Sequence, residues 1–230
     1  MKERIYYTAV GHTCWKTDEQ GNSYPAVILN RKEYVLDIQE LAVWTALYWN
    51  IADFDELEVK YHQLMENETY QPRSLEFCIE RLQTRGLVAS GTGKTDFGAL
   101  YDLLGGLYII PVARNMPLRV LASVMLFLSG SASADKARTL FQKDNRSEQE
   151  AQVMALSKQA LLSTAELIKC ADCGVTDVST DEKLLDALYS DADSNSDNLP
   201  FLMRGTKQQI PVTMAVANLY LRKQIVLERL

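Results

Sequence analysis

The chain has 230 residues, of which 47% are hydrophobic and 23% charged, and its formal net charge is −6 at pH 7. This composition predicts a folded protein of one large domain or two small ones, and the negative charge argues against a protein that coats nucleic acid indiscriminately. The four cysteines are too few for a secreted disulfide scaffold, and no signal peptide is apparent, so we expect a cytoplasmic protein.

The first third of the chain begins with strand-like sequence. Residues 5–15 and 24–35 are rich in aromatic and β-branched side chains and flank the turn-forming sequence TDEQGNS, which predicts a β-hairpin. Asp37 then has the character of a helix N-cap, with Glu40 as its reciprocal partner. The helix predicted from Ile38 to about Asn50 is apolar on nearly every face, so we expect it to be buried on several sides.

Two further helices are predicted before residue 86. The second covers about 55–66 and is acidic on its outer face, and the third covers about 72–85. Pro72 suits the first turn of the third helix, and Gly86 suits the position after its end. Its apolar side chains recur at helical spacing and predict one buried face: Leu75, Cys78, Ile79 and Leu82.

The sequence after the third helix predicts two strands joined by a flexible tip. Residues 87–89 and 107–112 are strand-like, and the glycine-rich sequence SGTGKTD follows the first of them. Residues 97–104, between the tip and the second strand, fit either a short helix or a strand.

This order of elements resembles the winged helix-turn-helix superfamily over about residues 34–113. The most specific part of the resemblance is the sequence LQTRGLV, from Leu82 to Val88, where glycine lets the chain turn sharply from the third helix into the first strand of the wing. The resemblance implies a mainly α fold with a small β component. A β-hairpin and a winged-helix domain would occupy residues 1–115, and an all-helical domain would occupy residues 116–230.

DNA-binding members of this superfamily place the third helix in the major groove and the wing on the adjacent backbone or minor groove. Carried onto this sequence, the resemblance implies a DNA-binding surface made of Arg73, Ser74, Phe77, Arg81, Thr84, Arg85, Lys94 and Thr95. Glu80 would face phosphates unfavourably, and an exposed aromatic such as Phe77 more often marks a protein contact. We therefore expect a DNA-binding transcriptional regulator, and the alternative is a protein–protein interaction module without specific DNA binding.

Three motifs that could carry chemistry are incomplete. The sequence GTGKT lacks the first glycine of a phosphate-binding loop, because Val88 stands there. The pair Cys170 and Cys173 has too few partners for a structural zinc site. The acidic residues 191–197 lack the glycine and the glutamate of a calcium loop. We therefore predict no enzyme activity, no cofactor and no metal, and a nucleotide-binding function is the least favoured.

The second half of the chain is predicted to be helical. Residues 118–128 are too few to cross a bilayer, so they predict a buried helix and no membrane partner. Capping-box patterns at Ser147 and Ser179 predict helices reaching about Cys170 and Tyr189, and a last helix is predicted over residues 211–230. This half could form a homodimer, bind an effector or a protein partner, or pack on the first half.

Overall fold

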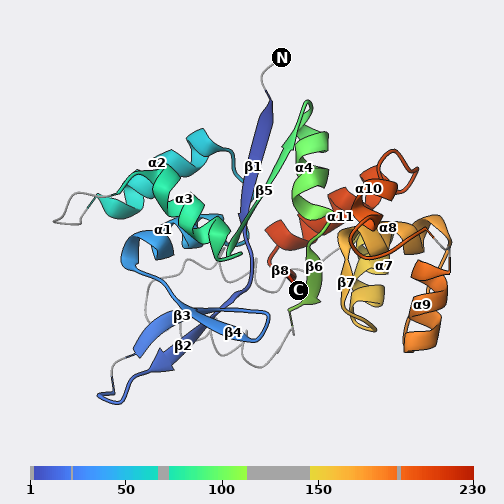
Figure 1. Cartoon of the computed structure of the whole chain (residues 1–230), viewed down its shortest axis with the longest axis horizontal. Coiled ribbons are helices and arrows are strands. Elements are labelled where there is room, and N and C mark those ends of the chain that lie inside the picture. The colour runs from blue at the N-terminus through green and yellow to red at the C-terminus, as the bar shows by residue number, and fades with distance from the viewer. Residues whose placement is uncertain (1–2, 22, 67–72, 113–145, 191–192) are drawn as a thin grey trace, which may run out of the picture.

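The computed structural model describes residues 3–21, 23–66, 73–112, 146–190 and 193–230. Of these residues 46% are helical and 21% lie in strands, and the strands form small antiparallel sheets. The prediction of a mainly α fold with a winged-helix N-terminal domain is wrong, because strands contribute to the structure from one end of the described chain to the other (Figure 1).

Four strands precede the first helix. Strands β2 (His12–Thr17), β3 (Ser23–Leu29) and β4 (Lys32–Val35) form an antiparallel meander, which confirms the predicted hairpin. Strand β1 (Arg4–Ala9) does not join it and pairs instead with the distant strand β5 (Val88–Gly93). The chain thus crosses from one sheet to the other at Val10 and Gly11.

Three helices follow the meander. Helix α1 (Ile38–Leu47) starts at the predicted capping box of Asp37 and Glu40, and its Trp44 and Leu47 are fully buried. Helix α2 (Phe54–Met65) is capped by Asp53, and helix α3 (Leu75–Thr84) by Ser74. The four apolar residues predicted to form the inner face of α3 are buried, and Gly86 has the positive φ predicted for the residue after the helix.

The predicted two-stranded wing is wrong. Strand β5 leads directly into helix α4 (Asp96–Leu104), whose N-cap is Thr95, and the partner of β5 is the N-terminal strand β1. The glycines explain this arrangement. A Cβ atom at Gly91 would lie 2.1 Å from the backbone nitrogen of Leu103, and one at Gly93 would lie 2.4 Å from that of Ala99. Both glycines are therefore required because α4 packs directly against β5.

The prediction of an all-helical region over 116–230 is wrong, because two strands of this half join a sheet. Strand β6 (Tyr108–Pro111) pairs with β7 (Leu162–Ser163) and with β8 (Ile225–Glu228). Around this sheet lie helices α7 (Glu148–Ser157), α8 (Thr164–Asp172), α9 (Asp181–Tyr189), α10 (Leu199–Leu202) and α11 (Gln209–Leu221). The predicted last helix ends nine residues early, because Lys223 takes a positive φ of 60° and the chain re-enters the sheet as β8.

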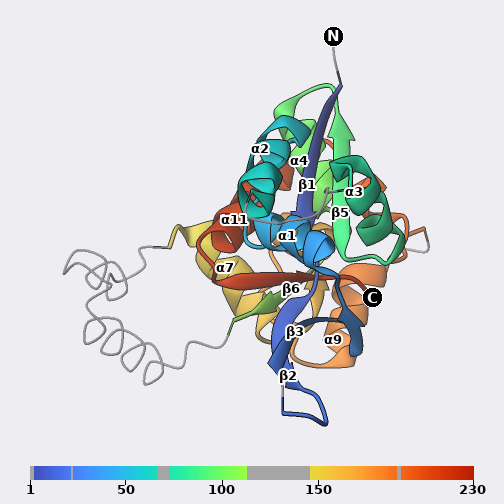
Figure 2. The same ribbon diagram turned by 90° about the vertical axis from the view of Figure 1, so that its left-hand side faces the viewer.

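The two halves of the described chain share one hydrophobic core. Figure 2 shows β8 lying beside β6 beneath the N-terminal helices, and the backbone nitrogen of Gly11 donates to the carbonyl of Leu227 at 2.8 Å. The hydroxyl of Tyr220 on α11 is buried among N-terminal residues. It accepts from Thr8 Oγ1 at 3.0 Å and from the backbone nitrogen of Trp49 at 2.9 Å. The boundary predicted at residue 115, like the predicted helix over 118–128, lies outside the described residues.

None of the described helices has the length and apolar character needed to span a membrane.

Substituting Arg31 by glycine should stabilise the protein. Asn30 and Arg31 form a two-residue hairpin turn with φ values of 46° and 61°, and an arginine pays a steric cost in that conformation that glycine does not. We expect Arg31→Gly to raise the free energy of unfolding by about 0.5–1 kcal/mol in urea titrations, because the relieved strain exceeds the entropic cost of glycine. The control Lys32→Gly, one residue into β4, should lower it. A midpoint below that of the wild type for Arg31→Gly would contradict the turn assignment.

Removing the hydroxyl of Tyr220 should be costly. Burial raises the pKa of Tyr220 to about 12, so the group is a neutral hydrogen-bonding hydroxyl. In Tyr220→Phe the nitrogen of Trp49 loses its acceptor, and we expect the free energy of unfolding to fall by about 1–3 kcal/mol. The matched control is Tyr24→Phe on strand β3, which should change stability little. Equal stability of the two variants would show that the hydroxyl does not join the halves.

Candidate functional site

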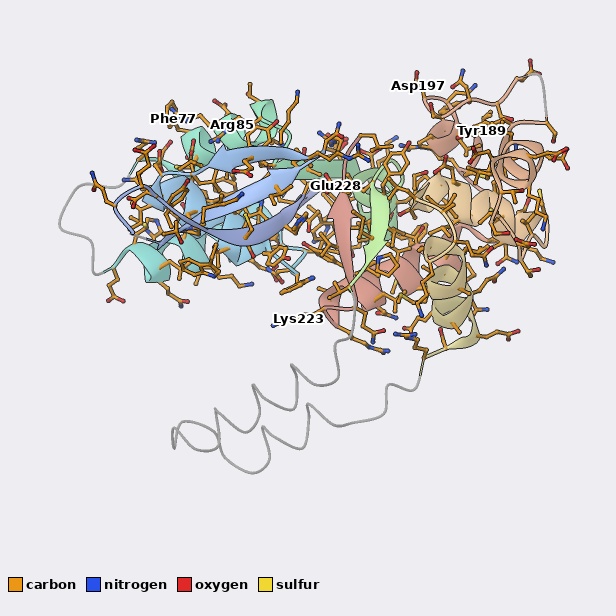
Figure 3. The ribbon with its side chains drawn as sticks, turned by 90° about the horizontal axis from the view of Figure 1, so that it is seen from below. Phe77, Arg85, Tyr189, Asp197, Lys223 and Glu228 are labelled. Carbon is orange, nitrogen blue, oxygen red and sulfur yellow. The ribbon has the colours of Figure 1, made fainter. Side chains whose placement is uncertain are left out.

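Helix α3 presents an outward face with an exposed aromatic ring. Its inner face is buried, so the side chains of Phe77, Glu80, Arg81 and Thr84 point away from the core. Phe77 is 45% exposed, whereas the other apolar side chains of this helix are buried. In Figure 3, Phe77 and Arg85 lie together at the end of the molecule far from Tyr189 and Asp197.

A buried carboxylate lies directly behind this face. Glu40, in the first turn of α1, is 1% exposed. Its Oε1 accepts from Arg81 Nε at 2.7 Å, and its Oε2 accepts from Arg85 Nη1 at 2.9 Å. Two arginines of the α3 region are thus used to neutralise one buried charge, which would otherwise be strongly unfavourable in the interior.

A second ion pair holds the start of α3. Arg73 Nη1 donates to Asp37 Oδ2 at 2.6 Å, and the backbone nitrogen of Arg73 donates to the side-chain oxygen of Gln39 at 2.9 Å. Burial alone would raise the pKa of Asp37. Hydrogen bonds from the backbone of Glu40 and from Arg73 outweigh it, so that pKa is lowered. The N-cap of α1 is therefore also the anchor of α3.

The ring of Phe77 lies between two guanidinium groups. Arg73 is 5.9 Å from the ring centroid and Arg81 is 5.8 Å from it, both within cation–π range. Two further apolar side chains are exposed close to these ion pairs: Val35, whose carbonyl accepts from Arg85 Nη2 at 2.9 Å, and Ile38, next to Asp37. We call this set the Phe77 surface; it consists of Val35, Ile38, Arg73, Phe77, Arg81 and Arg85.

The other predicted DNA-binding residues are not part of this surface. Ser74 caps α3 by accepting from the backbone nitrogen of Phe77, and the hydroxyl of Thr84 donates to the carbonyl of Glu80 at 2.8 Å. Lys94 and Thr95 lie beyond the end of β5 that is farther from α3. Thr95 caps α4, and Lys94 borders a cleft of about 510 Å³ whose lining includes Asp53 and Asp55.

Sequence reasoning missed the carboxylates that pair with the arginines. Asp37 and Glu40 were expected only as capping residues, and Val35 and Ile38 were not expected on a functional surface. Local spacing could not reveal these pairs, because Glu40 lies 41 residues from Arg81 and 45 from Arg85.

Among the described residues, the other candidate motifs do not form a metal, nucleophile or phosphate-binding site that would compete with the Phe77 surface. No group of three or more potential metal ligands occurs among them. Cys170 is buried and Cys173 is exposed, and burial raises the pKa of the Cys170 thiol to about 11, which makes it a poor nucleophile. The sequence GTGKT closes β5 and starts α4 without the full set of glycines of a phosphate-binding loop.

Comparison with known proteins adds no functional assignment. No family model matches the chain, no curated protein is significantly similar to it in sequence, and no solved structure is significantly similar to it in fold. The Phe77 surface is therefore the feature of the molecule from which a function can be inferred.

Acid should weaken the anchor of α3. Because the folded-state pKa of Asp37 is lowered, its stabilising effect is fully present above the unfolded value of about 3.9 and is lost as the pH falls through the folded value. We expect Asp37→Asn to be less stable than the wild type at pH 6, with the difference shrinking toward pH 2.5. Urea titrations at a series of pH values measure it. A difference that is independent of pH would show that the carboxylate charge contributes nothing.

Proposed function

We propose that the chain is a non-enzymatic protein-interaction module that binds a protein partner through the Phe77 surface. The observation that carries this proposal is an exposed aromatic ring, held between two arginines and bordered by the exposed side chains of Val35 and Ile38. Aromatic residues and arginine are the side chains most enriched where protein interfaces derive their binding energy.

The charges favour a protein partner over DNA. Arg81 and Arg85 are paired with Glu40, and Arg73 is paired with Asp37, so the cationic charge of this surface is largely compensated. Glu76 and Glu80 are also exposed on α3, and both would repel phosphates. Affinity for DNA depends on uncompensated cations that displace counterions, and Lys94 is too far along β5 to supply one here. The function of a DNA-binding regulator and the homodimer stay predictions.

A selection experiment tests the interaction proposal. A random dodecapeptide library displayed on phage would be selected on the purified full-length protein, and the enriched peptides would be synthesised with a fluorescent label. We expect Phe77→Asp to weaken their binding at least tenfold in fluorescence anisotropy, because a charge replaces the apolar anchor.

The matched control is Phe201→Asp. Phe201 is 75% exposed on α10, which lies on the other side of the molecule in Figure 1, so this variant should bind the peptides as the wild type does. Failure to enrich any peptide whose binding requires Phe77 would overturn the proposal. Sequence-selective, salt-sensitive binding to duplex DNA that is lost in Arg81→Ala or Arg85→Ala would instead support the regulator.

A further inference from the structure

Within the described part of the chain, the two arginines beside Phe77 have N–H donors that no acceptor uses. Arg73 engages Asp37 through Nη1, and Arg81 engages Glu40 through Nε. Among the described residues, no acceptor is bonded to Nη2 of Arg73 or to either Nη atom of Arg81. These side chains are 42% and 48% exposed, so the free ends of both guanidinium groups are open to a ligand on either side of the aromatic ring.

The buried carboxylate determines which donors stay free. Glu40 is fixed by its capping box and takes the Nε–H of Arg81, and no described residue accepts from the two Nη groups at the end of that guanidinium. A guanidinium fixed in this way loses less conformational entropy when it binds a second carboxylate. Its planar pair of N–H groups fits the two oxygens of a carboxylate.

We propose that the partner bound at the Phe77 surface presents a large apolar side chain with an Asp or Glu beside it in the same segment. This inference rests on the proposed interaction function and adds the chemistry that is recognised. The apolar side chain packs on the ring of Phe77 and against Val35 or Ile38, and the carboxylate accepts from the free Nη–H groups of Arg81.

A single carboxylate fits this surface better than a polyanion. The three arginines face two carboxylates, Asp37 and Glu40, which leaves about one uncompensated positive charge within the ion-paired cluster. One acidic side chain can bind at the Nη end of Arg81, whereas the exposed Glu76 and Glu80 on α3 disfavour further negative charges. A phosphate backbone would bring several negative charges close to Glu76 and Glu80 and would leave the apolar residues without a partner.

The experiment uses the peptides selected on the full-length protein, each compared with a copy in which Asp or Glu is replaced by Asn or Gln. On the wild-type protein, we expect the amide copy to bind about tenfold more weakly in fluorescence anisotropy at 50 mM salt. On Arg81→Gln, the acidic peptide and its amide copy should differ less than twofold, because the carboxylate has lost its bidentate partner.

Two further variants guard against a trivial loss of folding. Arg81→Lys keeps the charge near Glu40 without the planar fork, and it should lose most of the preference for the acidic peptide while it melts close to the wild-type temperature. Arg204→Gln removes an arginine that lies 5.7 Å from the ring of Tyr101, outside the Phe77 surface, and should leave the preference unchanged.

The outcomes separate this inference from the proposed function. Peptides that require Phe77 but bind equally well as their amide copies would overturn the carboxylate inference and leave the interaction function standing. A preference for the acidic peptide that persists in both Arg81 variants would also overturn it. If no selected peptide requires Phe77, both proposals are wrong.

Discussion

The buried carboxylate of Glu40 is the constraint on which the candidate site depends. An isolated charge at 1% exposure is strongly unfavourable, so the chain must bring cations to it. Arg81 and Arg85 supply them from the end of α3, which fixes how that helix lies against α1. In this orientation the other apolar side chains of α3 face the core, and Phe77 lies at the surface. The ion pairs with Glu40 thus reinforce the orientation that the apolar face of α3 already requires, with Phe77 at the surface.

Local features of the fold were predictable, and long-range partners were not. The capping box of Asp37, the inner face of α3 and the turn at Gly86 each depend on residues a few positions apart. Strand β5 looked like one half of a wing because the strand after the glycines is the next extended segment. Its true partner, β1, lies about eighty residues earlier, and the tight approach of α4 at Gly91 becomes visible only in three dimensions.

The candidate site shows the same division. That the outward side of α3 carries Phe77 and arginines followed from helical spacing alone, and the structure keeps Phe77, Arg73, Arg81 and Arg85 together. Helical spacing could not show that the arginines are ion-paired, because their carboxylate partners come from a helix about forty residues earlier in the chain. The ion pairing of the arginines favours a protein partner over DNA. A paired arginine attracts phosphate less than a free one, and it positions a neighbouring ring more firmly.

The pairing of β1 with β5 and of β6 with β8 has a consequence for the way the protein acquires its structure. Both pairs join segments separated by about eighty residues or more, and such non-local contacts make folding slow. During synthesis, β1 has no partner until three helices have left the ribosome. Strand β6 and the backbone nitrogen of Gly11 lack their partner β8 until residues 225–228 emerge from the ribosome. The exposed edge of β1 is then a place where aggregation competes with folding, and chaperone dependence during expression would be its practical sign.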